Sequence, residues 1–140
     1  MTRAEWAKMI LPRWGAPVTR RNKIVIASWI QAEGGTARAN PLNCIWPMPG
    51  ATLYNQVPGV KNYVSLEQGL EATARTLNYG ADHHQYGFRP IRHHLRSNSP
   101  AAVTLEAVED SQWGTGGLAL RCLPGVRAHW DDYRNRPITL

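Results

Sequence analysis

Residues 24–35 read IVIASWIQAEGG, and this stretch decides how the rest of the chain is interpreted. The run is apolar almost all round until Glu33, which predicts a helix buried at the centre of the protein. Thr19 and Asn22 are both suitable N-caps for this helix. The Gly34-Gly35 pair is expected to end it, because glycine readily adopts the left-handed conformation that follows many helices.

Glu33 interrupts an otherwise apolar face of this predicted helix. Ile26, Trp29 and Ile30 share that face at helical spacing. Burial there disfavours the charged form of the carboxyl and raises its pKa, as a general acid working near neutral pH requires. The alternative is an ordinary glutamate at a helix end, exposed to water.

Caps and breaks place the other elements around the central helix. Thr2 and Glu5 have the spacing of a capping box, and Pro12 is expected to end the first helix. Ser65, with Gln68 three residues later, is expected to cap another. The predicted elements are helices over 3–11, 66–80, 90–96, 100–110 (Ser99 as cap, Pro100 first) and 124–133, short strands at 52–54 and 60–64, and loops at 81–88 and 113–117.

Charge is concentrated near the N-terminus. The chain has a net charge of +6, and residues 1–23 carry six Lys or Arg against one acid, Glu5. A basic end favours a polyanionic partner such as nucleic acid, an anionic membrane or the bacterial cell wall, the alternative being a merely solvated face. Only Arg89, Arg92 and Arg96 come near the one-face pattern of a DNA-reading helix, so we expect no nucleic-acid partner.

Targeting and metal-binding signals are not found. No apolar run reaches 18 residues, so no membrane span is expected, and the N-terminus has no apolar segment of a signal peptide. Cys44 and Cys122 lack the spacing of metal ligands, and we predict free thiols. Histidine pairs at 83–84 and 93–94 match no zinc motif, so no metal or cofactor is expected.

Three short motifs follow the central helix in order: Asn-Pro-Leu-Asn at 40–43, Tyr-Val-Ser at 63–65 and Trp-Gly-Thr-Gly at 113–116. Together with the helix ending in Glu-Gly-Gly, this order resembles the lysozyme-like superfamily. It is closest to the peptidoglycan hydrolases of phages and actinobacteria, and is similar to the flagellar-type N-acetylglucosaminidases. The resemblance covers residues 24–80 firmly and 100–120 loosely.

The resemblance implies roles for particular residues. Glu33 would protonate the glycosidic oxygen, and Asn43 would help to hold the loop that follows it. Tyr63, Trp113 and Thr115 would line the sugar cleft. From the residues alone, Tyr63 is equally a core residue, and Trp113 is equally a plug between helices.

A second catalytic carboxylate is hard to find. Glycosidases commonly use a pair, and a hen-type lysozyme takes its second from the β lobe. Here no Asp or Glu lies between Glu33 and Glu67. Asp110 is the best remaining candidate, since Glu67 and Glu71 are expected to be solvated. This gap favours a one-carboxylate mechanism or assistance by the substrate's own N-acetyl group.

The sequence thus predicts a mainly α (α+β), lysozyme-like fold: a central buried helix, a small β-hairpin lobe and surrounding helices. We expect one domain over 1–140, with an N-terminal helix and basic segment at 1–20 and a catalytic core at 21–140. The expected function is cleavage of peptidoglycan glycan strands by a glycosidase or lytic transglycosylase, encoded by a phage.

Partners and location follow from that function. The protein would be made in the cytoplasm and act on the anionic cell wall, alone or with other virion proteins. The alternative is a non-catalytic structural or wall-binding module of a phage particle.

Overall fold

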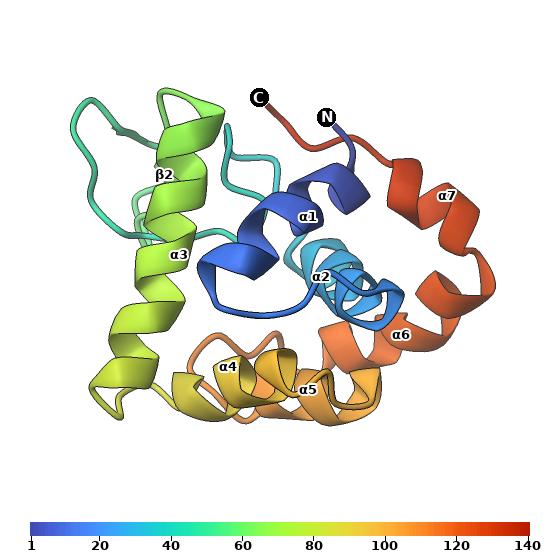
Figure 1. Ribbon diagram of the computed structural model, residues 1–140. Helices are drawn as coiled ribbons and strands as arrows, with labels where there is room; N and C mark the ends of the chain where they lie inside the picture. The colour runs from blue at the N-terminus through green and yellow to red at the C-terminus, as the bar shows by residue number, and fades with distance from the viewer.

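A computed structural model describes residues 1–140 as a mainly helical protein with one small antiparallel sheet (Figure 1). No helix is long and apolar enough to cross a membrane. The elements are α1 (Arg3–Arg13), α2 (Arg20–Glu33), β1 (Thr52–Leu53), β2 (Lys61–Asn62), α3 (Leu66–Asp82), α4 (Phe88–Arg96), α5 (Ala101–Glu109), α6 (Leu118–Ala128) and α7 (Trp130–Asn135).

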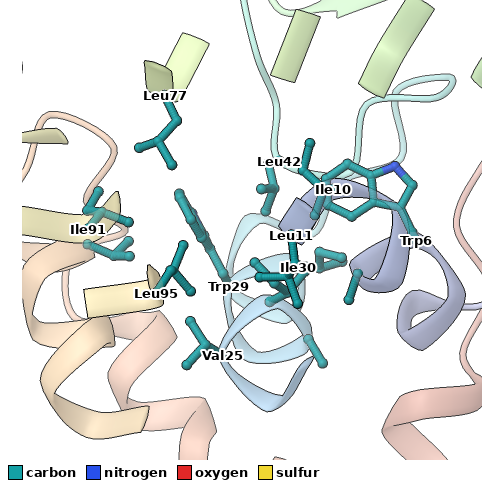
Figure 2. Close-up of a cluster of buried hydrophobic side chains, with 14 of the residues drawn as sticks. Trp6, Ile10, Leu11, Val25, Trp29, Ile30, Leu42, Leu77, Ile91 and Leu95 are labelled. Atoms are coloured by element: carbon teal, nitrogen blue, oxygen red, sulfur yellow. The ribbon is translucent and has the colours of Figure 1, made fainter. Parts of the chain in front are cut away.

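Helix α2 lies at the centre, as predicted. Helices α1, α5, α6 and α7 pack directly against it, while α3 stands to one side and contacts α1 and α4. Figure 2 shows Trp29 between two groups of buried side chains, with Leu77, Ile91 and Leu95 on one side and Ile30 near α1 on the other. These residues belong to one continuous core of 33 buried residues.

The predicted caps of three helices are confirmed. Thr2 and Glu5 form both hydrogen bonds of a capping box, and the Ser65 hydroxyl accepts from the Gln68 N–H. Of the two candidates for α2, Thr19 is the cap, because its hydroxyl accepts from the Asn22 N–H at 3.1 Å. Gly34 closes the helix in the left-handed conformation, with φ of 59°.

Asn22 is fully buried instead of capping α2. Its amide nitrogen donates to the carbonyls of Pro17 (3.0 Å) and Leu95 (2.9 Å). The residue therefore joins the start of α2 to the end of α4 through the core.

The hairpin is shorter than predicted. Thr52 pairs with Asn62 and Leu53 with Lys61, so each strand holds two residues. The Lys61 N–H then donates to the Cys44 carbonyl at 3.2 Å, so its donor is used outside the pair. The Asn55 side chain accepts from the N–H groups in the turn, at Gly59 and Val60, which ends the ladder at the other side.

Prolines account for two of the corrected helix boundaries. Pro12 was predicted to end the first helix but lies inside α1, where the Trp14 N–H closes the last turn on the Leu11 carbonyl. Pro100 is not the first residue of α5; it is the extended N-cap residue. The Ser99 hydroxyl does not cap the helix and instead contacts His94.

The remaining boundaries also differ from the predicted ones. Helix α3 continues to Asp82, two residues past Gly80, and α4 begins at Phe88 after a left-handed Gly87. The single helix predicted over 124–133 is wrong: α6 and α7 are separated at His129. The predicted loop at 113–117 is confirmed.

Both cysteines carry free thiols. Cys44 is buried against α3, where its Sγ lies 3.6 Å from the Thr73 hydroxyl, and burial raises the pKa of this thiol to about 12. Cys122 lies on α6 and is partly accessible.

Gly69 is required where α3 passes the 39–43 loop. A Cβ at this position would lie 1.9 Å from the Ala39 carbonyl oxygen, whereas a Cβ at Gly125 in α6 would meet nothing closer than 3.9 Å. We expect Gly69→Ala to lower the free energy of unfolding by about 1–3 kcal/mol or more. Gly125→Ala should raise it by roughly 0.5–1 kcal/mol, because alanine favours helix. Urea unfolding measures both, and equal stabilities would contradict the packing described.

Candidate active site

Glu33 is the last residue of α2, and its side chain is half-buried. The two preceding turns of α2 are apolar on this side, because Ile26 and Trp29 are fully buried and Ile30 is 2% exposed. The exposed Gly34 follows directly. The carboxyl therefore stands at the edge of the core, where the buried helix reaches the surface.

Burial raises the pKa of the Glu33 carboxyl from 4.5 to about 7. A hydrogen bond from Asn43 and the nearby indole N–H of Trp29 lower the pKa in part, and the negative charge of Glu109 raises it. The net result is a carboxyl that keeps its proton close to neutral pH. This property is the one that a general acid needs.

Asn43 holds Glu33 through two hydrogen bonds. Its amide nitrogen donates to the Glu33 carbonyl at 3.0 Å and to the carboxyl oxygen Oε2 at 3.1 Å. The residue adopts a left-handed conformation, with φ of 57°. Asn43 therefore fixes both the end of α2 and the orientation of its carboxyl.

The loop that carries Asn43 is itself anchored. The Asn40 side chain accepts from the Cys44 N–H at 2.8 Å and donates to the carbonyls of Cys44 and Lys61. Asn40 is fully buried, so these bonds are shielded from water. The loop from 40 to 44 is thereby tied to the hairpin.

Trp29 places a free donor beside Glu33. Its indole N–H is buried without a hydrogen-bond partner and lies near the carboxyl. A buried N–H without a hydrogen-bond partner lowers the stability of the fold. Its interaction with the neighbouring carboxyl becomes favourable when that carboxyl ionises. The group is therefore suited to stabilise Glu33 after it has given up a proton.

Trp113 packs between helices. It is 9% exposed, its ring and that of Trp29 meet edge to face with 4.8 Å between their centroids, and its indole N–H donates to the Leu42 carbonyl at 3.0 Å. This placement agrees with the alternative interpretation of Trp113, in which its ring fills the space between helices. The hydrogen bond also brings the 113–117 loop against the loop that holds Glu33.

Tyr63 is also a core residue in this structure. Its side chain is fully buried, its hydroxyl donates to the Trp46 carbonyl at 2.8 Å, and burial raises its pKa above the usual range. Its closed surroundings leave no ring face for a sugar. Tyr63 therefore has the core position that was the alternative interpretation of this residue.

Thr115 binds the carboxylate of Glu109, a residue that was not among the candidates predicted from the sequence. The Thr115 N–H donates to Glu109 at 2.5 Å, and its hydroxyl donates to both carboxylate oxygens at 2.9 and 2.8 Å. The Ala119 N–H adds a bond at 3.1 Å. Although burial acts to raise the pKa of Glu109, the hydrogen bonds from the backbone and side chain of Thr115 to its charged form lower it.

Glu109 therefore acts as a remote N-cap for α6. That helix begins after Gly117 without a side-chain cap of its own, and the carboxylate of Glu109 serves its first turn. The missing Ser, Thr or Asp before residue 118 was a signal in the sequence that could have indicated this role. Asp110, favoured for its closeness to Trp113 in the sequence, is exposed.

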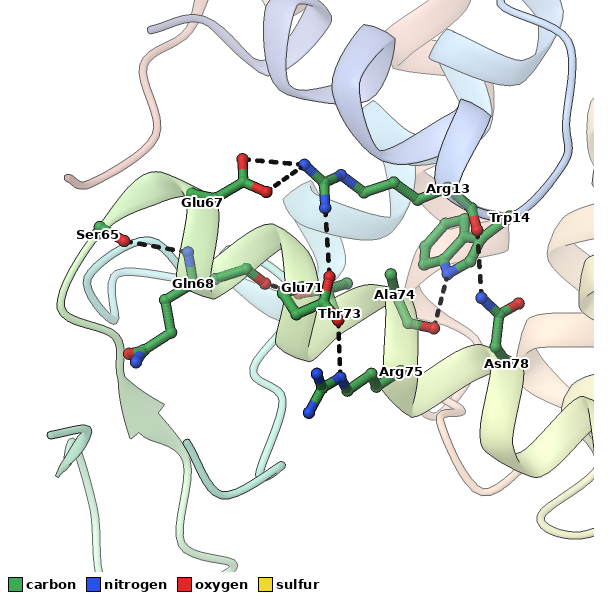
Figure 3. A network of polar contacts seen from close by, with 11 residues as sticks. Arg13, Trp14, Ser65, Glu67, Gln68, Glu71, Thr73, Ala74, Arg75 and Asn78 are labelled. Atoms are coloured by element: carbon green, nitrogen blue, oxygen red, sulfur yellow. Dashed lines mark hydrogen bonds and ion pairs between the residues drawn. The ribbon is translucent and has the colours of Figure 1, made fainter. Parts of the chain in front are cut away.

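The other carboxylates considered lie away from Glu33. Arg13 pairs with Glu67 at 2.8 Å and with Glu71 at 3.5 Å, which joins α1 to α3 (Figure 3). Glu71 also pairs with Arg75. No group of three His, Cys, Asp or Glu side chains gathers in a way that could hold a metal ion.

No protein-family model, curated protein or solved structure matches this chain.

Glu109→Gln tests how the two carboxylates are coupled. Burial accounts for most of the raised pKa of Glu33, and the charge of Glu109 adds to it. Loss of that charge should therefore lower the pKa of Glu33 by a fraction of a unit while glutamine keeps part of the α6 cap. The ¹³C carboxyl shift of Glu33, followed through a pH titration, measures the change. A rise in the pKa of Glu33 would contradict the coupling. Asp110→Asn is the matched control, because it also removes one negative charge.

Proposed function

We propose that this protein cleaves the glycan strands of peptidoglycan, with Glu33 as the general acid, in a lysozyme-like fold. The observation that carries the proposal is the half-buried carboxyl with a pKa of about 7, held by Asn43 at the end of a buried helix. The Glu-Gly-Gly helix end and the three motifs after it favour a glycan as the substrate.

The chemistry begins with proton transfer. Glu33 donates its proton to the glycosidic oxygen, the bond to the anomeric carbon breaks, and positive charge develops on the sugar. Glu33 is left as a carboxylate, with the Asn43 amide at 3.1 Å and the Trp29 indole N–H nearby. Both donors favour this charged form.

Glu109 is not placed to act as a nucleophile. Its oxygens already accept hydrogen bonds from Thr115 and Ala119. The sugar cation is therefore quenched by the substrate: its N-acetyl oxygen attacks the anomeric carbon, or a muramic 6-hydroxyl closes an anhydro ring. In the first route, water then opens the oxazolinium ring at the anomeric carbon, which leaves a reducing end, and the water gives its proton to Glu33. In the second route the 6-hydroxyl returns its proton to Glu33.

Charge supports a wall-bound substrate. The net charge is +6, and Lys8 and Arg20 of the basic N-terminal segment are exposed. Bacterial walls are anionic, so these exposed positive charges favour association with them. We propose that the protein is phage-encoded, is made in the cytoplasm and reaches the wall alone or in a virion.

Product analysis tests the proposal. Purified sacculi incubated with the protein should release soluble muropeptides, and mass spectrometry should show whether they end in anhydro rings or in reducing sugars. Anhydro ends would assign the second route of quenching, and reducing ends the first. Sacculi that bind the protein but release nothing would contradict the proposal and favour the non-catalytic wall-binding module.

A further inference from the structure

A second surface feature, away from Glu33, has the chemistry of a sugar-binding site. A hollow of about 480 Å³ lies between the C-terminal half of α3, the end of α1 and the loop at Trp46. Glu33 and Asn43 do not line it. Of the six tryptophans, five are buried in the core, and Trp46 alone is half-buried.

An aromatic platform forms one wall of this hollow. The rings of Trp46 and Tyr79 meet edge to face at 5.8 Å, and His83 stacks on Tyr79 at 4.1 Å. Tyr79 is nevertheless 40% exposed. Because its neighbours hold the ring in place, a ligand would lose little binding energy in ordering it.

Positive and negative side chains are present in equal number around the aromatic platform. Arg13 and Arg75 are matched by Glu71 and Asp82, all on the lining of the hollow. Figure 3 shows Glu71 of α3 paired with Arg13, at the end of α1, and with Arg75 of α3. The side chain of Arg75 remains 52% exposed, so its guanidinium is accessible.

This balance of charge distinguishes between ligands. A polyanion such as DNA needs an excess of cations to replace its counterions, and this hollow offers none. A sugar ring is uncharged, with an apolar C–H face that stacks on aromatic rings and with polar groups at its edge. Aromatic rings with a polar handle suit such a half-apolar ligand.

We propose that the hollow lined by Trp46, Tyr79 and Arg75 binds a sugar ring, as a carbohydrate site separate from Glu33. That the natural ligand is a peptidoglycan strand rests on the proposed function. A second site of this kind keeps the protein on an insoluble polymer between cleavage events, since two linked contacts hold more tightly than either alone.

An NMR titration tests the site without requiring cleavage. ¹⁵N-labelled Glu33→Gln protein is titrated with N-acetylglucosamine tetramer, and the Trp46 indole N–H is assigned from the spectrum of Trp46→Phe. We expect that signal and the α3 amides near Tyr79 to shift saturably. Shifts confined to the surroundings of Glu33, or shifts of the same α3 signals with duplex DNA, would overturn the proposal.

Binding to sacculi provides a second readout. In the Glu33→Gln background, Tyr79→Ser should weaken binding about tenfold, because it removes a stacking ring. Tyr86→Ser is the matched control, since Tyr86 is 43% exposed but lies outside the hollow. Circular dichroism confirms that both variants fold. Equal binding by the two would overturn the proposal.

The two proposals fail in different ways. Sugar binding at Trp46 by a protein that releases nothing from sacculi would uphold the site and contradict the proposed cleavage. Release of muropeptides with no response at Trp46 and no loss in Tyr79→Ser would uphold cleavage and overturn the site.

Discussion

Glu33→Gln is expected to remove wall-cleaving activity while the fold is kept. A positioned general acid contributes about 10²–10⁴-fold to rate, and glutamine has no proton of suitable acidity to donate. The turbidity of a sacculus suspension, followed beside the wild type, measures the loss. Asp110→Asn is the matched control, because this carboxylate is exposed and is not among the groups that shift the pKa of Glu33.

Stability separates a chemical effect from misfolding in this comparison. The folded protein holds the Glu33 proton up to about pH 7, whereas an unperturbed glutamate releases it near 4.5. The carboxyl therefore lowers stability as pH rises through that window, and glutamine does not. Glu33→Gln should be at least as stable as the wild type at pH 8. Equal cleavage by the folded variant would remove Glu33 from the mechanism.

Wild-type activity is expected to fall as pH rises above about 7. Burial raises the pKa of Glu33 to about 7, so the protonated, active form declines roughly tenfold for each further pH unit. Initial rates of release from sacculi between pH 5 and 9, at constant ionic strength, measure this limb. Constant ionic strength is needed because the basic surface makes wall binding salt-dependent.

The lower part of the same profile provides a control. Below pH 7, Glu33 stays protonated, so no loss of the acid is expected there. A rate that climbs steadily from pH 5 to 9 would show that an ionised group, acting as a base, limits cleavage instead.

Local signals predicted the centre of this fold well. The apolar run at 24–33 and the Gly34 stop define α2, and the caps at Thr2 and Ser65 define the starts of α1 and α3. Each signal acts within one helical turn, where a side chain meets its own backbone. The raised pKa of Glu33 was predictable for the same reason, since its apolar neighbours precede it on one helix.

Contacts between residues that are far apart in the sequence could not be predicted from such local patterns. The Ala119 N–H in the first turn of α6 is bound by Glu109, on another helix, as well as by Thr115. The lack of a cap residue at Gly117 indicates that a partner is needed but does not say which residue supplies it. Trp113 is buried because it fills space against Trp29, which is distant in the sequence. The pattern Trp-Gly-Thr-Gly identifies a loop but does not say which way its ring points.

The most direct test of the central claim is the pKa of Glu33 itself. The claim is that a large share of this carboxyl is still protonated at neutral pH and can therefore act as an acid. A ¹³C NMR titration of the side-chain carboxyl, with its signal assigned by absence in Glu33→Gln, gives the value without any substrate. The structure predicts a midpoint of about 7. A midpoint near the ordinary 4.5 would mean that Glu33 is ionised at neutral pH, and would contradict the mechanism.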